Sequence, residues 1–180
     1  MLFVDVRGST SMAERMSAAE FSKRMRRFYA VATDVLVERD ALLDKLVGDE
    51  VIGIFMPALA GAEPARQAVE AARELLQATG HGSAGGPWIA VGVGVHTGPA
   101  YFGTVTGTDG TFSDFTALGD NMNIAARLTS SAGPGEALIS DAAYEAAKLD
   151  LGEPEHRQLE LKGRSEPVGV HVLRVDAPSG

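Results

Sequence analysis

The sequence predicts an α+β fold, in which a ferredoxin-like βαββαβ core is followed by an extra C-terminal helix and further strands. Up to His96, short apolar runs of strand length alternate with two longer amphipathic segments in the order β-α-β-β-α-β. Beyond His96, strand-length runs continue around two shorter helical segments. We therefore expect antiparallel core strands whose two helices cover one face of the sheet.

The core elements begin and end at recognisable signals. Capping-box patterns start at Ser11 and at Ser17, and a helix is expected to follow them. Pro64 and Gly80 bracket a second helix. The expected elements are strand 2–6, the helix after it, a hairpin of strands 42–46 and 51–56, helix 64–79 and strand 89–96.

The second half of the chain predicts shorter elements, in which Ser140 or Asp141 caps the last helix. They are strands 101–105 and 115–118 around a polar loop at 106–113, helix 121–128, strand 137–139, helix 141–148, and strands 159–161 and 168–173.

Composition limits the function classes. The 180 residues fit one domain, 1–180, and a hydrophobic content of 45% suffices for a folded core. A net charge of −8 argues against nucleic acid as a partner, because phosphate backbones are held by surplus Lys and Arg. The chain lacks cysteine, which agrees with a reducing, cytoplasmic location, and it lacks an apolar run of about 18 residues, so we expect no membrane contact by this domain. The first strand begins almost at Met1, which suggests a fragment of a larger protein that also carries a regulatory domain.

Two aspartates stand where a strand gives way to a glycine-containing turn: Asp5 before Gly8, and Asp49 after Gly48. In a β-α-β-β core the first strand lies beside the hairpin, so the two carboxylates can converge at one edge of the sheet. Paired carboxylates without nearby Cys or paired His suit Mg²⁺ or Mn²⁺, which points to phosphoryl or nucleotidyl transfer. Each aspartate taken singly could equally be a turn residue.

Asn123 and Arg127 lie four residues apart and therefore share a helix face. A permanent cation beside a neutral donor suits a developing oxyanion, although a solvated helix face has the same pattern.

Two lysines are further candidates. Strand alternation places Lys45 on the same side as Leu43 and Val47, and Lys162 stands at the end of a strand. Each could serve a ligand, Lys162 by reaching phosphate oxygens, or be an ordinary surface lysine.

The segment Gly8-Ser9-Thr10 joins the first strand to its helix, where backbone N–H groups could cradle the phosphates of a substrate. It is not a Walker loop. The four histidines are dispersed along the sequence and receive no role: His81, His96, His156 and His171.

Taken in order, five segments resemble a class III nucleotidyl cyclase homology domain, over nearly the whole chain. They are Phe3-x-Asp5-Val6-x-Gly8-Ser9-Thr10, Lys45-x-x-Gly48-Asp49-x5-Phe55, the turn at 94–98, the stretch 114–128, and Leu161-Lys162-Gly163 followed by Pro167-Val168.

The resemblance implies the nucleotide cyclase fold and a role for each candidate. Asp5, Asp49 and the Val6 carbonyl would hold two Mg²⁺ or Mn²⁺ ions. The other implied roles are base reading by Lys45 and Thr116, in a pairing that resembles the adenine-selective one, ribose orientation by Asn123, charge stabilisation at the α-phosphate by Arg127, and contact with the outer phosphates by Lys162.

The implied reaction is cyclisation of ATP to 3′,5′-cyclic AMP with release of pyrophosphate. In this family the metal aspartates come from one subunit and the base-reading and transition-state residues from the other, so the resemblance implies a homodimer with two equivalent sites. Preference for GTP is one alternative, and a non-catalytic nucleotide-binding or dimerising signalling domain is another. A diguanylate cyclase is a weaker one, because its similarity is confined to the hairpin around Asp49.

Overall fold

The computed structural model describes residues 1–111 and 113–175. Phe112, which falls in the expected loop 106–113, and residues 176–180 of the expected domain lie outside the described residues. Within the described residues, no helix combines the length and the apolar character needed to cross a bilayer.

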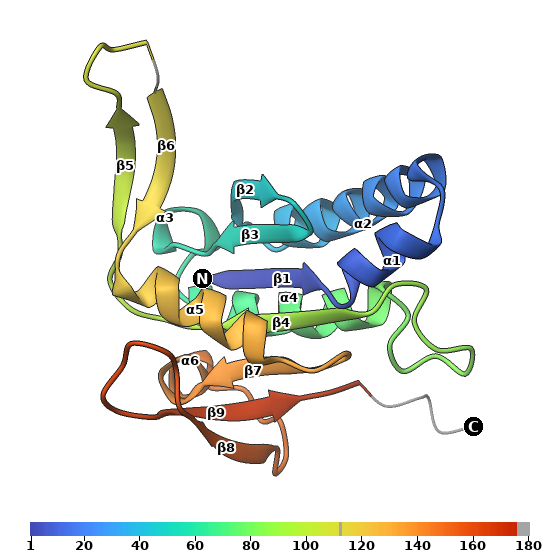
Figure 1. Ribbon diagram of the computed structural model, residues 1–180. Coiled ribbons are helices and arrows are strands. Elements are labelled where there is room, and N and C mark those ends of the chain that lie inside the picture. Colours follow the sequence, from blue (N-terminus) through green and yellow to red (C-terminus); the bar gives the residue numbers. More distant parts are fainter. Residues whose placement is uncertain (112, 176–180) are drawn as a thin grey trace.

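The helices and strands follow the predicted order closely (Figure 1). They are β1 Leu2–Val6, α1 Ser9–Arg15, α2 Ala18–Glu38, β2 Leu42–Val47, β3 Glu50–Ile54, α3 Pro57–Ala60, α4 Pro64–Ala78, β4 Val91–Val95, β5 Tyr101–Thr106, β6 Ser113–Leu118, α5 Asp120–Ser131, β7 Ala137–Ser140, α6 Asp141–Ala147, β8 Glu155–Leu159 and β9 Val168–Leu173.

Seven strands form the main sheet in the order β2-β3-β1-β4-β7-β9-β8. β1 is antiparallel to both of its neighbours, β3 and β4, whereas β4 and β7 are parallel. The strands β2-β3-β1-β4 with α2 and α4 make the βαββαβ unit, so the predicted α+β fold class is confirmed.

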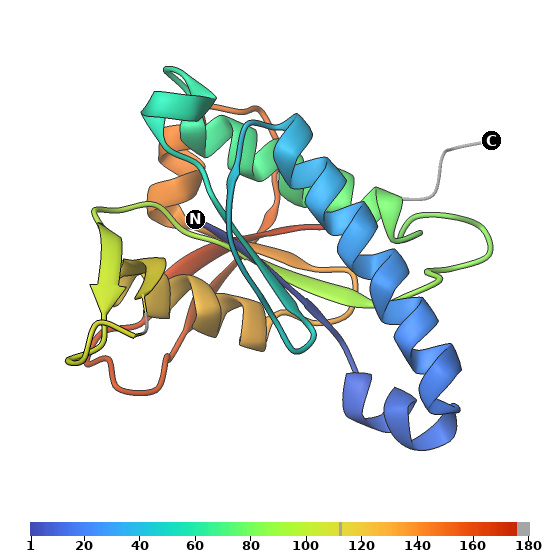
Figure 2. The same cartoon turned by 90° about the horizontal axis from the view of Figure 1, so that it is seen from above.

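Helices cover both faces of this sheet (Figure 2). Leu2, Val4 and Val6 point into the larger core cluster, to which α2 and α4 contribute. Phe3 points to the opposite side, where it packs with Met122 and other residues of α5. The expectation of helices on one face therefore holds for the two core helices, while α5 covers the other face.

Several element boundaries differ from those predicted, most clearly at the first helix and at β8, and the short helix α3 was not predicted. The first helix begins at Ser9 behind a Gly8 N-cap, so the pattern at Ser11 is not a cap. The pattern at Ser17 is a capping box, in which the Ser17 hydroxyl accepts from the Glu20 N–H and the Glu20 carboxylate accepts from the Ser17 N–H.

The strand expected over 159–161 is also displaced, because β8 runs from Glu155 to Leu159. β8 is an edge strand with mostly exposed, polar residues, so it lacks the apolar signal of a buried strand. Leu161 is buried for another reason, since it packs with Ile124 and Leu128 of α5.

The hairpin of β5 and β6 forms a separate two-stranded sheet that stands away from the main one (Figure 1). It exposes four large apolar side chains: Tyr101, Val105, Phe115 and Leu118. Exposed apolar groups concentrated on one projecting element are typical of interaction surfaces.

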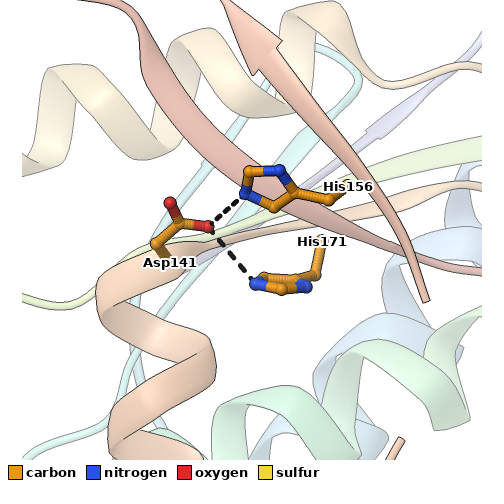
Figure 3. Close-up of side chains that lie close together, drawn as sticks. All are labelled: Asp141, His156 and His171. Atoms are coloured by element: carbon orange, nitrogen blue, oxygen red, sulfur yellow. Dashed lines mark hydrogen bonds and ion pairs between the residues drawn. The ribbon is translucent and has the colours of Figure 1, made fainter. Parts of the chain in front are cut away.

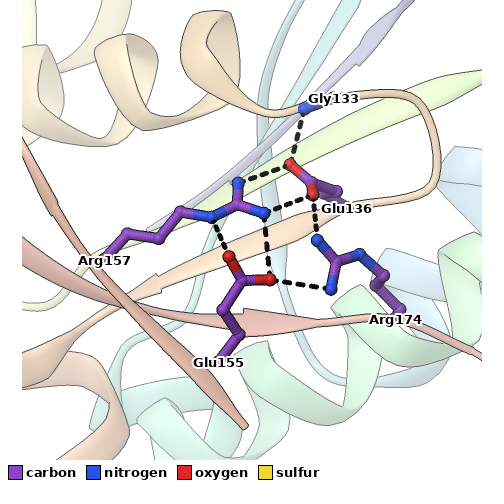
Figure 4. Close-up of polar contacts among 5 residues, drawn as sticks. All are labelled: Gly133, Glu136, Glu155, Arg157 and Arg174. Carbon is purple, nitrogen blue, oxygen red and sulfur yellow. Dashed lines mark hydrogen bonds and ion pairs between the residues drawn. The ribbon is translucent and has the colours of Figure 1, made fainter.

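An ion-pair network ties together the strands at the other edge of the sheet (Figure 4). The Glu136 carboxylate accepts two hydrogen bonds from the Arg157 guanidinium, at 2.9 and 3.0 Å, and others from Arg174 and from the Gly133 N–H. Glu155 accepts from both arginines. The network therefore joins the start of β7 to β8 and to the end of β9.

Candidate active site

The two predicted metal-binding aspartates lie at the same end of the sheet. Asp5 stands opposite Glu50 in the pairing of β1 with β3, and the Val6 N–H donates to the Asp49 carbonyl oxygen at 3.1 Å. These contacts hold the end of β1 against the tip of the β2–β3 hairpin, as the fold prediction required. Residues that are 44 positions apart in the sequence thus converge.

The carboxylates form an unbalanced negative cluster. Burial raises the pKa of Asp5 to about 6; the Arg7 guanidinium opposes this shift and Asp49 reinforces it. Burial, with repulsion from Asp5 and Asp49, also raises the pKa of Glu50 to about 7. Oxygen donors that repel one another in a partly buried site fit a hard divalent cation, which would relieve the repulsion.

Sequence reasoning missed Arg7 and Glu50 at this site. The Arg7 guanidinium forms an ion pair with Asp5 and also donates to the Ala132 carbonyl oxygen at the end of α5. Strand alternation carried the signal for Arg7, because residues 5 and 7 point to the same side. Glu50 is opposite Asp5 only through the strand register, which the sequence does not state.

The turn after β1 has the backbone that its glycine permits. Gly8 has a φ of 70°, in the left-handed region, and caps α1. The Ser9 hydroxyl donates to the Asp49 carboxylate, and Thr10 is exposed. Phosphate contact by this turn stays a prediction.

The structure brings Lys45 and Thr116 onto adjoining elements, because β2 packs beside β6. Lys45 Nζ donates to the Asp114 carboxylate at 2.6 Å, and the buried Thr116 lies two residues further along β6. A β-bulge interrupts β2 between Leu43 and Lys45. Lys45 therefore does not share the side of Leu43, which packs towards the helices α2 and α4, and the prediction from simple alternation was wrong on this point.

Arg127 and Lys162 lie at the loop that connects β8 to β9, and Asn123 lies one turn before Arg127 on α5. Asn123 is exposed and Arg127 half-buried on α5. The Arg127 guanidinium packs over Gly163, with Nη2 3.5 Å from the position that a Cβ there would take. Residues 160–167 line an open pocket of about 540 Å³ that includes Lys162.

These three side chains are available to a ligand. In residues 1–111 and 113–175, no hydrogen bond or ion pair engages the side chains of Asn123, Arg127 or Lys162, and none links them to the carboxylates of Asp5 and Asp49. Within the described residues, the carboxylates and these three side chains are thus two groups that no hydrogen bond or ion pair joins.

A buried histidine, to which the sequence assigned no role, positions α5. His96 contacts the Ser140 hydroxyl through Nδ1 at 2.8 Å and the Asn121 side-chain oxygen through Nε2 at 2.9 Å. The Asn121 amide nitrogen donates to the Pro99 carbonyl oxygen. A Cβ on Gly98 would lie 2.5 Å from Asn121, so a glycine is needed there. This network fixes the first turn of the helix that carries Asn123 and Arg127.

Comparison with known proteins assigns the chain to a family. The model of the adenylate and guanylate cyclase catalytic domain matches residues 1–174. The chain belongs to this family. The predicted resemblance to a class III nucleotidyl cyclase is thus confirmed, and the domain described here is a nucleotide cyclase domain.

Individual relatives agree with this assignment. An adenylate cyclase of Anabaena cylindrica is 30% identical over 97% of this chain and 36% of its own length. The chain spans about a third of the length of the first curated relatives that it matches.

Solved structures of both specificities have the same fold. The adenylyl cyclase CyaB from P. aeruginosa has a TM-score of 0.80 at 29% identity, over 99% of this chain and 95% of that one. The guanylyl cyclase Cya2 has a TM-score of 0.79 at 26% identity, over 99% and 93%. Similarity to these cyclase domains does not choose between ATP and GTP.

Proposed function

We propose that this cyclase domain is an adenylate cyclase, which converts ATP to 3′,5′-cyclic AMP and pyrophosphate in a homodimer. The observation that carries catalysis is the convergence of Asp5 and Asp49 at one end of the sheet, in a cluster whose charge calls for a cation. The choice of ATP rests on Lys45 and Thr116 on adjoining strands, a pairing that resembles the adenine-selective one, and on the relatives named adenylate cyclase.

Asp5 and Asp49, with the Val6 carbonyl, would hold two Mg²⁺ or Mn²⁺ ions. Such ions supply positive charge that acidifies the ribose 3′-hydroxyl and neutralises the triphosphate. The chain's own groups do the positioning. Asn123 would orient the ribose, and Lys162, with the backbone of the Gly8-Ser9-Thr10 turn, would hold the outer phosphates.

In the reaction, the ribose 3′-oxygen passes its proton to solvent and forms a bond to the α-phosphorus, while the bond from that phosphorus to the bridging oxygen breaks and pyrophosphate leaves. Negative charge accumulates on the α-phosphate oxygens. Arg127, which is permanently charged and has no competing ion pair in the described part of the chain, would stabilise this charge.

A homodimer would unite the two groups of catalytic residues. The carboxylates of one subunit would meet Lys45, Thr116, Asn123, Arg127 and Lys162 of its partner. The exposed apolar side chains of the β5–β6 hairpin, with Leu46 and Val47 of β2, support such an interface.

We also propose a cytoplasmic location, where ATP is available. A regulatory domain would lie elsewhere in a longer protein, because the relatives are about three times as long as this chain.

The first test measures cyclic nucleotide production from ATP or GTP with Mn²⁺, across a range of protein concentrations. Cyclic AMP formation that rises faster than linearly with protein and disappears in Asp49→Ala supports the proposal. Asp34→Ala, which changes an exposed carboxylate on α2, is the matched control and should stay active. Cyclic GMP as the main product would favour guanylate cyclase, and no product from a confirmed dimer would favour a binding module.

Mixing two inactive variants tests the shared site. A heterodimer of Asp49→Ala with Arg127→Ala has one site with both defects and one intact site. Random pairing should therefore restore about a quarter of the wild-type activity, since half of the dimers are mixed and each has one working site of two. An inactive mixture of folded, dimeric chains would refute a site built from two subunits.

A further inference from the structure

A second cluster of metal-ligating side chains lies among α6, β8 and β9 (Figure 3). Asp141 begins α6, His156 lies in β8 and His171 in β9. The Asp141 Oδ1 atom is 2.9 Å from His156 Nε2 and 3.3 Å from His171 Nε2. One potential ligand atom from each residue lies within 4.8 Å of the other two.

Strand register and a glycine without a side chain bring the residues of this cluster together from three elements. His156 and His171 are directly opposite in the antiparallel pairing of β8 with β9, so their rings point to the same side of the sheet. Gly169 lies two residues before His171 on that same side. A Cβ on Gly169 would lie 2.0 Å from the Asp141 Oδ2 atom, so the carboxylate occupies space that any other residue would fill.

Neighbouring groups hold the His171 ring. Tyr144, one turn into α6, stacks on it with ring centroids 3.7 Å apart. The Nδ1 atom of His171 is buried without a hydrogen-bond partner among the described residues, so Nε2 is the polar atom that the His171 ring presents to the cluster.

We propose that Asp141, His156 and His171 form a second divalent-metal site, distinct from the carboxylate cluster at Asp5 and Asp49, and that it takes a transition-metal dication such as Zn²⁺. Two imidazole nitrogens and one carboxylate oxygen are a borderline-soft ligand set, which suits Zn²⁺ better than Mg²⁺. Zn–N bonds of about 2.0–2.1 Å put tetrahedral ligand atoms about 3.3 Å apart, close to the separations found here. The proposal does not depend on the reaction that the domain catalyses.

Bound metal would clamp α6 to the β8–β9 hairpin. His156 and Asp141 are 43% and 44% exposed, so the site is open to solvent on one side and a water molecule can complete the coordination. A ligand that binds the folded chain and not the unfolded one raises the melting temperature with its concentration. Zn²⁺ should therefore stabilise the domain.

The test is Zn²⁺ titration by calorimetry on the whole chain with the Asp49→Ala change, which removes a predicted ligand of the active-site metals. We expect one Zn²⁺ per chain to remain in that background. His156→Gln removes an exposed ligand, and Gly169→Ala displaces the Asp141 carboxylate without removing any ligand. Each should weaken Zn²⁺ binding by at least the roughly 10–100-fold that the loss of an outer-shell partner causes. Gln158→Ala, an exposed change on the same strand as His156, should bind Zn²⁺ as tightly as the chain that has the Asp49→Ala change alone.

Co²⁺ absorption in the visible range gives a second readout, because four-coordinate nitrogen–oxygen sites absorb strongly and six-coordinate oxygen sites weakly. A strong band in the parent that is lost in His156→Gln would support the site. Equal Zn²⁺ affinity in parent and His156→Gln, or no Zn²⁺ bound to the parent, would overturn it. Melting curves recorded in EDTA show whether each variant is folded. If His156→Gln is unfolded, the Co²⁺ spectrum of Gly169→Ala replaces it, and an unchanged strong band in that variant would overturn the site.

Discussion

The ion-pair network around Glu136 makes a quantitative prediction about stability (Figure 4). Hydrogen bonds from Arg157, from the Gly133 N–H and from Arg174 outweigh partial burial and lower the pKa of Glu136 from 4.5 to about 2. Such a fall corresponds to about 3 kcal/mol at neutral pH, because each pKa unit is worth about 1.4 kcal/mol. Arg157 and Arg174 are 30% and 47% exposed, so solvent screens the pairing. We therefore expect about half, roughly 1.5 kcal/mol.

The perturbation is Glu136→Gln, which keeps the shape of the side chain and removes its charge. Its free energy of unfolding, from urea denaturation followed by circular dichroism, should be about 1.5 kcal/mol lower than that of the parent at pH 7. Glu153→Gln, an exposed change just before β8, should have no measurable effect.

The dependence on pH gives the sharper test. A carboxyl whose pKa is lowered by folding stabilises the native state fully above its unfolded pKa of 4.5, and this stability is lost as the pH falls towards about 2. More than half of the difference between parent and Glu136→Gln should disappear between pH 7 and about pH 3. A difference that is absent at pH 7, or unchanged at pH 3, would refute the reasoning.

Three further predictions concern the proposed active site and the dimer. Folding raises the pKa of Glu50 from 4.5 to about 7, so the charge on Glu50 destabilises the native state as the pH rises through this window. Glu50→Gln should therefore make the metal-free protein about 1–2 kcal/mol more stable at pH 8 and leave its stability unchanged at pH 4. Equal melting temperatures of parent and variant at pH 8 would contradict this. Phe115→Ser, at a side chain 52% exposed on β6, should abolish the dimer in analytical ultracentrifugation and lower activity at least about tenfold, whereas Leu59→Ser, 51% exposed on α3, should do neither. A Cβ added at Gly8 would meet no atom within 4 Å, but the backbone there has a φ of 70°. Gly8→Ala should therefore lower the free energy of unfolding, measured by urea denaturation, by about 1 kcal/mol through backbone strain. Unchanged stability would argue against that conformation.

Much of the fold was predictable because it depends on local signals. Apolar runs and breakers such as Pro64 and Gly80 predicted nearly every element, and the β-α-β-β-α-β order was enough to expect β1 beside the hairpin. The errors lie where a local signal is weak or ambiguous. The edge strand β8 buries little and has no apolar alternation, and the bulge before Lys45 inserts a residue that alternation cannot foresee.

The candidate catalytic residues could be named from the sequence, because motif spacing preserves the order of functional groups along a chain. The sequence by itself determined the family, the fold class and the presence of Asp5, Asp49, Asn123 and Arg127. Tertiary structure decided which groups meet. The opposition of Glu50 to Asp5, the seating of Arg127 over Gly163, and the meeting of His156 with His171 all depend on strand register or packing between distant segments. Such contacts arise from the burial of whole faces of the sheet, and no short stretch of sequence contains that information.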